Sequence, residues 1–288
     1  MKICAIILDY RGAGKTETCL RSLIAEGIDT VLVVDNSGDA HASAQLAEAV
    51  ARVRSAGIDF ALHLIEPGVN TGFARGVNLA LADPAGQHCE AIMLLNNDAA
   101  AHAGAIRPLH DALLDGAAQL VGPMVVDDHG APQPVPWYHR YFGTITNSPA
   151  PGAFPYLSGC CLMLRRSLLR EGKLFDEDFF MYGEDALLGW QMARAHQTFK
   201  RINNATIRHT GQARSQRSTL FYEYQMTRAH YLLCFKTCRT RWEIPVLLVT
   251  KFATLTLRMA VRCIRYRSPA PLAALFLAWL PLDIRKAA

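Results

Sequence analysis

Residues 91–98 read AIMLLNND, an apolar run that ends in two amides and a carboxylate. Such a run, without polar alternation, is typical of a strand that is buried on both faces of a parallel sheet. Three other runs have the same character and are each followed by an acid: Ile3–Leu8, Thr30–Val34 and Phe60–Ile65. Helical patterns lie between them, over Lys15–Ala25 and Gly72–Leu81. The alternation predicts an α/β fold with a mostly parallel sheet flanked by helices.

The polar residues that follow these strands are the first candidates for a binding site. Ligands of open α/β sheets bind beyond the carboxyl ends of the strands, where Asp9, Asp35 and Asp98 are expected. Asp35 could accept hydrogen bonds from a nucleobase or a ribose, although Asp-Asn-Ser-Gly is also an ordinary turn. The amides and the carboxylate at 96–98 offer oxygen ligands to a divalent ion that also binds a diphosphate.

The pattern changes in the second half of the chain. Residues 122–155 are rich in Pro, Gly and aromatic residues, which predicts a long loop or an irregular excursion, of the kind that often shapes a substrate pocket. A strand is expected over Tyr156–Arg165 and a helix over Asp185–His196. We expect two domains: a catalytic domain over residues 1–218 and a basic, apolar helical region over residues 219–288.

The formal net charge of +5 is unevenly distributed along the chain. Residues 220–288 hold 11 Lys and Arg against three acids, whereas residues 1–219 hold 19 basic and 22 acidic residues. This asymmetry predicts a neutral-to-acidic catalytic body with a basic tail for an anionic partner. The eight cysteines form no CxxC pair and the apolar N-terminal run is short. We therefore expect reduced, buried thiols in a cytosolic protein.

Glu184 and Asp185 lie between the aromatic segment 179–182 and the apolar run 186–190. Carboxylates in apolar surroundings lose hydration, which raises their pKa toward values that suit a general base. Acids at the start of a helix also commonly cap its first turn. The pair is therefore a candidate catalytic base, with a helix cap as the alternative.

Residues 12–16 form a possible phosphate-binding loop, because they follow a strand and open a helix. Asp9 stands where a Walker loop has its first glycine, so its carboxylate would face phosphate oxygens. A P-loop-like NTPase or kinase that uses Lys15 and Thr16 stays as a rival interpretation.

Four segments carry a resemblance to a known family, in this order along the chain: residues 35–37 (DNS), 70–78 (NTGFARGVN), 95–98 (LNND) and 175–185 (FDEDFFMYGED). Together they resemble the GT-A glycosyltransferases of family 2, especially the rhamnosyltransferase-like branch, over about residues 3–235. The resemblance implies a GT-A, Rossmann-like fold. It also implies metal-dependent, inverting transfer of a sugar, with rhamnose favoured, to a lipid-linked or polysaccharide acceptor in cell-surface glycan synthesis.

The resemblance also implies roles for individual residues. Asp185 is the expected base, assisted by Glu184, and Asp98 the expected ligand of Mg²⁺ or Mn²⁺, with His209 as a candidate second ligand. The donor is a dTDP-, UDP- or GDP-sugar, and the residues expected to bind its nucleotide are Asp9, Tyr10, Asp35, Asn36, Asn70, Gly72, Phe73, Asn78 and Asn97. The residues expected near the acceptor are Ser158, Gly159 and Tyr182. Two departures are visible: Asp9-Tyr10-Arg11 replaces the usual Asn-Tyr-Asn, and Ala229 replaces the Asn that usually follows Arg228.

The apolar segment Ile244–Arg267 predicts a helix with one cationic stripe, formed by Lys251, Arg258, Arg262 and Arg265. Such a helix would lie in a membrane interface with its arginines toward anionic head groups, and residues 268–282 would form a re-entrant or interfacial segment. The alternative is that both segments pack on the body or on a second subunit. We expect a peripheral protein on the cytoplasmic face of the plasma membrane that binds no nucleic acid. A membrane-bound scaffold with a degraded transferase site is the non-enzymatic rival.

Overall fold

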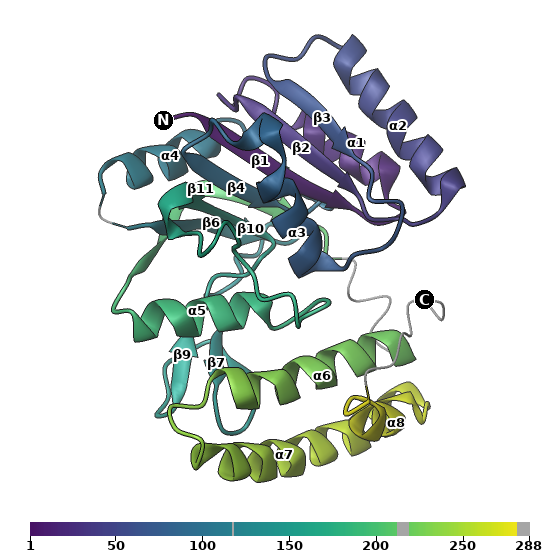
Figure 1. The fold of residues 1–288 in the computed structure, drawn as a ribbon, viewed down its shortest axis with the longest axis vertical. Coiled ribbons are helices and arrows are strands. Elements are labelled where there is room, and N and C mark those ends of the chain that lie inside the picture. The colour runs from purple at the N-terminus through teal and green to yellow at the C-terminus, as the bar shows by residue number, and fades with distance from the viewer. Residues whose placement is uncertain (117, 212–218, 281–288) are drawn as a thin grey trace. The chain divides into compact units, whose positions relative to one another are not determined.

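The computed structural model describes residues 1–116, 118–211 and 219–280. Contacts divide the chain into two compact units (Figure 1). The first unit comprises Met1–Pro134, Leu157–Asp176 and Met192–Gly211, and the second comprises Val135–Tyr156, Glu177–Gln191 and Gln212–Ala288. The predicted domain boundary after residue 218 adjoins residues 212–218, which lie outside the described residues, so it stays a prediction.

The first unit is built on an eight-stranded sheet of order β3-β2-β1-β4-β10-β6-β11-β5 (Figure 1). The strands are β1 (Ile3–Asp9), β2 (Thr30–Asp35), β3 (Ala61–Ile65), β4 (Ala91–Leu95), β5 (Ala99–Ala101), β6 (Leu120–Val126), β10 (Cys161–Arg165) and β11 (Phe199–His209). β3, β2, β1 and β4 are parallel, as are β6 and β11, whereas β10 and β5 run antiparallel to their neighbours. The predicted α/β fold with a mostly parallel sheet is therefore confirmed.

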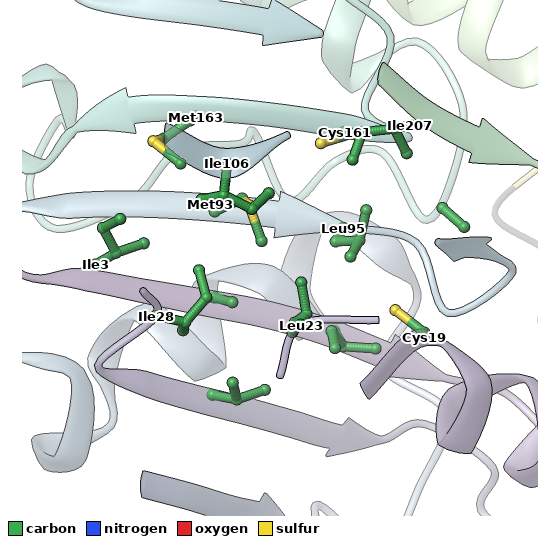
Figure 2. Packing of buried hydrophobic residues seen from close by; sticks show 14 of the residues in the cluster. Ile3, Cys19, Leu23, Ile28, Met93, Leu95, Ile106, Cys161, Met163 and Ile207 are labelled. Carbon is green, nitrogen blue, oxygen red and sulfur yellow. The ribbon is translucent and has the colours of Figure 1, made fainter. Parts of the chain in front are cut away.

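Helices flank this sheet: α1 (Ala13–Arg21), α2 (Ala40–Ser55), α3 (Phe73–Ala82) and α4 (Ile106–Leu114). Side chains of α1, α2 and α4 join alternate residues of the strands in one buried cluster, part of which Figure 2 shows around Met93. Burial of each aliphatic side chain stabilises the fold by roughly 1.5–3 kcal/mol, so this cluster dominates the stability of the unit. α3 approaches β1 closely, because a Cβ added to Gly76 would lie 2.6 Å from Leu8 Cδ2.

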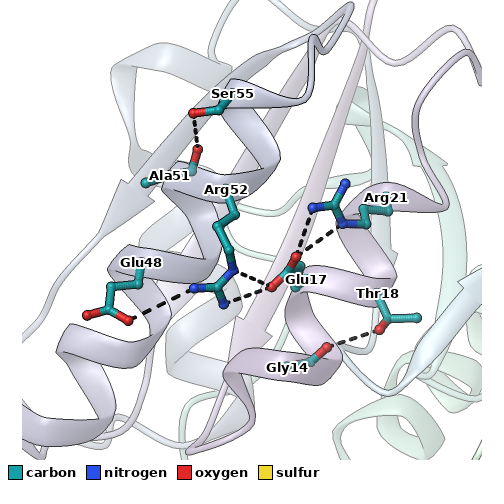
Figure 3. A network of polar contacts seen from close by, with 8 residues as sticks. All are labelled: Gly14, Glu17, Thr18, Arg21, Glu48, Ala51, Arg52 and Ser55. Carbon is teal, nitrogen blue, oxygen red and sulfur yellow. Dashed lines mark hydrogen bonds and ion pairs between the residues drawn. The ribbon is translucent and has the colours of Figure 1, made fainter.

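A polar network joins α1 to α2 at the surface (Figure 3). The Glu17 carboxylate accepts hydrogen bonds from Arg21 of its own helix at 2.9 Å and from Arg52 of α2 at 2.8 Å. These hydrogen bonds, first from Arg52 and then from Arg21, lower the pKa of Glu17. Because exposed ion pairs contribute little free energy, the network orients the helices more than it stabilises them.

The second unit contains a three-stranded antiparallel sheet of order β8-β7-β9. Its strands and helices are β7 (Trp137–His139), β8 (Ile145–Thr146), β9 (Ala153–Pro155), most of α5 (Glu184–Arg194), α6 (Leu220–Lys236), α7 (Glu243–Tyr266) and α8 (Ala270–Leu277). The Tyr138 hydroxyl lies 2.9 Å from Nδ1 of His230, and Arg140 donates to the Thr237 carbonyl oxygen at 2.9 Å. These buried contacts join the small sheet to the helices.

The prediction of a long loop over residues 122–155 is wrong in part. β6 continues to Val126, and β7, β8 and β9 follow within the segment. These strands are two or three residues long, too short to produce a recognisable alternation. The predicted strand over Tyr156–Arg165 begins only at Cys161, where pairing with β4 starts. The helices expected over Asp185–His196 and Ile244–Arg267 correspond to α5 (Glu184–Arg194) and α7.

The predicted direction of the cationic stripe on α7 is also wrong. Lys251 is fully buried, and its Nζ donates to the His230 carbonyl oxygen at 3.3 Å. Arg262 Nε donates to both oxygens of the buried Glu223 carboxylate, at 2.9 and 3.1 Å. The stripe therefore faces the interior of the second unit, where α6 supplies its partners, and not lipid head groups. Arg265 is the exposed member of the predicted stripe.

All eight cysteines are free, and six of them are buried. Burial raises the pKa of the Cys4 thiol to about 12, so this thiol is neutral at physiological pH. The expectation of unpaired, buried thiols is confirmed for six cysteines, whereas Cys238 and Cys263 are unpaired but partly exposed. The cytosolic location stays a prediction.

Candidate functional site

The carboxyl edge of β1, β2 and β4 gathers the polar residues that follow these strands. In the sheet register Asp9, the last residue of β1, pairs with Asp35, the last residue of β2. Residues 96–98 follow β4, the other neighbour of β1, and lead into β5. The structure therefore places Asp9, Asp35 and Asp98 where ligands of open α/β sheets bind.

Asp9 is fully buried at this edge and its carboxylate is held by its own chain. Oδ1 accepts a hydrogen bond from the Gly12 N–H at 3.1 Å, and Oδ2 accepts from the Thr16 hydroxyl at 2.5 Å and from Asn97 Nδ2 at 3.2 Å. A Cβ on Gly12 would lie 2.7 Å from Asn97 Nδ2, so this glycine makes room for the amide. Asp9 thus fixes the start of α1 and the position of Asn97, while Tyr10 is exposed beside it.

A second network ties the end of β2 to the turn before α3. Asn36 Nδ2 donates to the Gly72 carbonyl oxygen at 2.9 Å, and Asn36 Oδ1 accepts from the Thr71 N–H at 2.7 Å. The Asn70 side chain accepts from the Gly72 N–H at 2.9 Å. Gly72 has a φ of 79°, a conformation that glycine adopts without strain. Asp35 accepts from the Ser37 N–H at 2.9 Å and from the Ser43 hydroxyl.

Phe73 and Asn78 of α3 hold the segment that follows β10 in the chain. The Phe73 and Phe175 rings lie 5.8 Å apart. Asn78 Nδ2 donates to the Phe175 carbonyl oxygen at 2.8 Å, and its Oδ1 accepts from the Leu174 N–H at 3.0 Å. The predicted donor-binding residues of segment 70–78 thus include two that anchor a neighbouring loop.

Asp98 and His209 form the candidate metal centre. Asp98 Oδ1 lies 3.1 Å from His209 Nε2, and both side chains are largely buried. The strand pairing of β5 with β11 brings the two residues together. Burial alone lowers the pKa of His209, but its hydrogen bonds with Asp98 and Cys160 raise it to about 10. A carboxylate and a deprotonated imidazole fit a first-row divalent ion, so binding of a metal at His209 would release the proton that its raised pKa retains. Among residues 1–116, 118–211 and 219–280, no third His, Cys, Asp or Glu completes a set with them.

The residues expected near the acceptor fall in both units. Gly159 is buried in the first unit, and the exposed Ser158 beside it accepts from the Cys160 N–H through its hydroxyl at 3.3 Å. Tyr182 belongs to the second unit, where its ring meets that of Tyr222 edge-on at 5.5 Å. Tyr182 has a φ of 68°, a left-handed conformation that costs a non-glycine residue roughly 1–3 kcal/mol. Such strain is typical of residues beside a functional site.

Glu184 and Asp185 begin α5 in the second unit, directly after Gly183, whose φ is 88°. Asp185 Oδ1 accepts from the Ala186 N–H at 2.7 Å, so this carboxylate meets a first-turn amide as the capping alternative predicts. Glu184 is buried, and its Oε2 has no hydrogen-bond partner among the described residues. Burial, and then the charge of Asp185, raise the pKa of Glu184 to about 8. Both interpretations of the pair are thus compatible with the geometry.

Replacing Glu184 with glutamine is expected to flatten the pH dependence of stability. Because the folded-state pKa of about 8 exceeds the ordinary value of 4.5, the contribution of Glu184 to stability is fully present below pH 4.5 and is lost as the pH rises through 8. The loss is on the order of 2–4 kcal/mol. Urea unfolding at pH 5.5 and 8.5 measures this loss for wild type and E184Q, with the exposed Glu66→Gln as the matched control. An equal change in the free energy of unfolding between the two pH values in wild type and E184Q would contradict the raised pKa of Glu184.

Several polar partners in these networks were missed from the sequence. Ser43 bonds to Asp35, Thr71 to Asn36, and the Cys160 thiol to His209. Thr71 lies inside segment 70–78, which carries part of the family resemblance, so the sequence did indicate that it lies near the site. Ser43 and Cys160 meet their partners only through the packing of α2 and the turn before β10, which local patterns do not reveal.

Comparison with known families finds a family model that matches the first part of the chain. The family model described as "Glycosyl transferase family 2" matches residues 4–173. The chain is 27% identical over 184 residues to an N-acetylglucosaminyl-diphospho-decaprenol L-rhamnosyltransferase of Mycobacterium tuberculosis. That alignment covers 51% of this chain and 58% of the relative, so the chain spans less than two thirds of the curated relative that it matches.

Two solved structures share the fold. One is the mannosyltransferase PcManGT from Pyrobaculum calidifontis in complex with GDP-Man and Mn²⁺, with 17% identity, a TM-score of 0.58, and coverage of 97% of this chain and 86% of that one. The other is GalNAc-T7 with UDP, GalNAc and Mn²⁺, with 11% identity, a TM-score of 0.62, and coverage of 80% and 47%. At these identities the likeness establishes the fold alone, which is the expected GT-A fold.

Proposed function

Because the chain belongs to glycosyl transferase family 2 and is a glycosyltransferase, we propose that it moves rhamnose from a nucleotide sugar to a lipid-linked or polysaccharide acceptor in cell-surface glycan synthesis. The observation that carries this proposal is the gathering of Asp35, Asp98 and His209 at the carboxyl edge of one sheet. Asp35 and Asp98 lie within the residues 4–173 that match the family model, and His209 lies beyond them. The choice of rhamnose and of a lipid-linked acceptor rests on the similarity to the mycobacterial rhamnosyltransferase.

The first unit supplies the donor-binding half of the proposed reaction. Asp35 accepts hydrogen bonds from the nucleobase or ribose, and the networks around Asn36 and Asp9 hold the surrounding loops in place before the donor arrives. Preorganised loops avoid the free energy of ordering on binding. Tyr10 is exposed at the same edge and is the candidate to stack on the base.

Asp98 and His209 are the residues that hold Mg²⁺ or Mn²⁺ in this proposal. The diphosphate oxygens of the donor would supply further oxygen ligands beside these two side chains. When bound, the ion supplies Lewis-acid neutralisation of the charge that develops on the diphosphate. The similar structures of GalNAc-T7 and PcManGT both contain Mn²⁺, which supports a divalent ion in this proposal. They do not decide between Mg²⁺ and Mn²⁺ for this chain.

Asp185 is the proposed general base. The acceptor hydroxyl oxygen attacks C1 of the sugar, and its proton passes to the Asp185 carboxylate. The bond between C1 and the diphosphate oxygen breaks, and the nucleoside diphosphate leaves with the electron pair. A single displacement of this kind inverts the configuration at C1, because no second carboxylate acts as a nucleophile. Glu184 assists by positioning the base or by binding the acceptor.

A ligand screen tests the donor half of the proposal. Thermal unfolding of the full chain is measured with dTDP-, UDP- and GDP-sugars, each with and without Mn²⁺. A true donor is expected to stabilise the fold in the presence of the ion, by about 2.7 kcal/mol at a concentration 100 times its Kd. Such stabilisation also contradicts the rival of a scaffold with a degraded site. No stabilisation by any nucleotide sugar would overturn the donor assignment.

The NTPase interpretation is wrong. The family match overturns it, and the Thr16 hydroxyl, which a Walker loop directs at Mg²⁺, donates instead to the buried Asp9 carboxylate. Lys15→Ala is therefore expected to leave the rate of sugar transfer within about two-fold of wild type, because Lys15 contributes nothing to the proposed site. Initial rates of sugar transfer measure it. A loss of more than tenfold (about 1.4 kcal/mol in transition-state free energy) would restore a role for this lysine.

The proposed site of action is the inner surface of the plasma membrane, where a lipid-linked acceptor is found. The 24-residue α7 is long and apolar enough to cross a membrane by length and composition. Most of its apolar window is not buried within the described residues, which supports contact with lipid.

A further inference from the structure

We propose that the outer face of α7 and α8 binds in the head-group layer of an anionic membrane, with α7 lying along the surface. The proposal rests on the membrane location given under the proposed function. The face of α7 that contacts lipid is the apolar one, opposite to the arginine stripe expected from the sequence. We define the outer face by its exposed apolar residues: Trp242, Val246, Val249, Phe252, Leu257, Val261, Ile264, Leu272 and Phe276.

The apolar residues of α7 form one continuous strip. In the first half of the helix, Trp242, Val246 and Val249 are spaced four and three residues apart. In the second half, Leu257, Val261 and Ile264 have the same spacing. Residues at such intervals lie on one side of a helix. Trp242 is 89% exposed and Ile264 is 81% exposed, and contiguous exposed apolar patches mark sites of contact with a protein or a membrane. The strip therefore needs a partner that covers most of the helix length.

The opposite side of α7 packs against the interior of the second unit. Leu247, Leu255 and Met259 are buried there beside Lys251, and Leu255 and Met259 share a core cluster with α6 and α8. A helix that crossed the bilayer would place Lys251 and Arg262 in hydrocarbon and remove the carbonyl and carboxylate partners that they have now. The geometry therefore favours a helix that lies in the interface over one that spans it.

The charges around the strip select an anionic surface. Arg239 and Arg241 precede α7, and Arg265 and Arg267 end it; all four are exposed. The acids of residues 219–280 are Glu223, which is buried against Arg262, and Glu243, which accepts hydrogen bonds from Arg140 and the Arg239 N–H. The surface charge at both ends of the strip is thus positive. Arginines at head-group height beside a buried apolar face are typical of helices that bind anionic lipid.

A second copy of the chain fits this surface less well. Two such faces packed together would bring the arginine pairs of both copies to the rim of one apolar interface. Like charges opposed at a rim disfavour association, whereas anionic lipid head groups neutralise them. Anionic lipid is therefore the expected partner of this surface, and self-association would instead appear as a dimer in sedimentation.

Vesicle flotation of the full chain tests the proposal without any assay of activity. Wild type is mixed with phosphatidylcholine vesicles that contain or lack phosphatidylglycerol. Leu257→Glu with Ile264→Glu removes apolar contact at exposed positions, and Arg241→Gln with Arg265→Gln removes charge. Leu114→Glu, at an exposed apolar position of α4 in the first unit, is the matched control.

The expected result is that wild type and L114E float with anionic vesicles, whereas L257E/I264E floats at least about tenfold less. R241Q/R265Q should lose the preference for anionic over neutral vesicles. Equal flotation of all variants, or no flotation of wild type, would overturn the proposal, as would a dimer in sedimentation that L257E/I264E dissociates without any lipid binding. If flotation follows the prediction but no nucleotide sugar binds, the proposed function fails while the membrane surface stands.

Discussion

Replacing Asp185 with asparagine is expected to lower the turnover number of sugar transfer by ~10²–10⁴-fold, because the amide cannot take the proton of the acceptor hydroxyl. The affinity for the nucleotide sugar should stay within about two-fold, since the proposed donor-binding residues belong to the first unit. Initial rates with a saturating donor give the turnover number, and calorimetric titration gives the donor affinity. A loss confined to turnover identifies a group that acts on the reacting atoms.

A neighbouring acid provides the matched control for this experiment. Asp178 precedes the same helix and forms an ion pair with Lys236 at 2.5 Å, with its side chain mostly exposed. Asp178→Asn makes the same chemical change outside the proposed site and should keep most of the activity. If D185N retains activity within a few-fold of wild type, Asp185 is not the base, and Glu184 becomes the carboxylate to examine next.

Replacing Asp98 with asparagine is expected to weaken Mn²⁺-dependent binding of a nucleoside diphosphate by roughly 10–100-fold. The neutral amide keeps the shape of the side chain but removes the anionic ligand that the ion needs. The affinity in the presence of EDTA should be the same for wild type and variant, because the nucleobase contacts are unchanged. Calorimetric titration with UDP and with dTDP, each with Mn²⁺ and with EDTA, measures both quantities.

Asp111→Asn serves as the control, because Asp111 is an exposed acid of α4 that pairs with Arg107 at 3.7 Å. An equal loss in D98N with and without Mn²⁺ would mean that Asp98 supports the fold and not the ion. Unchanged binding of the nucleotide in Mn²⁺ would show that Asp98 is not a ligand of the ion.

The strands that position the candidate site could be predicted because each is a continuous buried run. The residues that end β1, β2 and β4 follow directly from those runs, so the location of Asp9, Asp35 and Asp98 at one edge was accessible from the sequence. The partners of these side chains were not. Asp9 looked open to a ligand, yet the fold directs the Thr16 hydroxyl and the Asn97 amide onto its carboxylate.

The stripe on α7 shows a second limit of sequence patterns. Helical periodicity correctly placed Lys251, Arg258 and Arg262 on one side of a helix, but it does not tell which side faces the protein. That choice depends on partners distant in sequence: Glu223 lies 39 residues before Arg262, and His230 lies 21 residues before Lys251. Their presence in α6 compensates the cost of burying the cations and leaves the apolar side exposed.

A crystal structure of the chain with Mn²⁺ and a nucleoside diphosphate tests the central claim most directly. The account predicts that Asp98 and His209 both ligate the ion and that the diphosphate binds to the same ion. An ion that is bound elsewhere, away from Asp98 and His209, contradicts it.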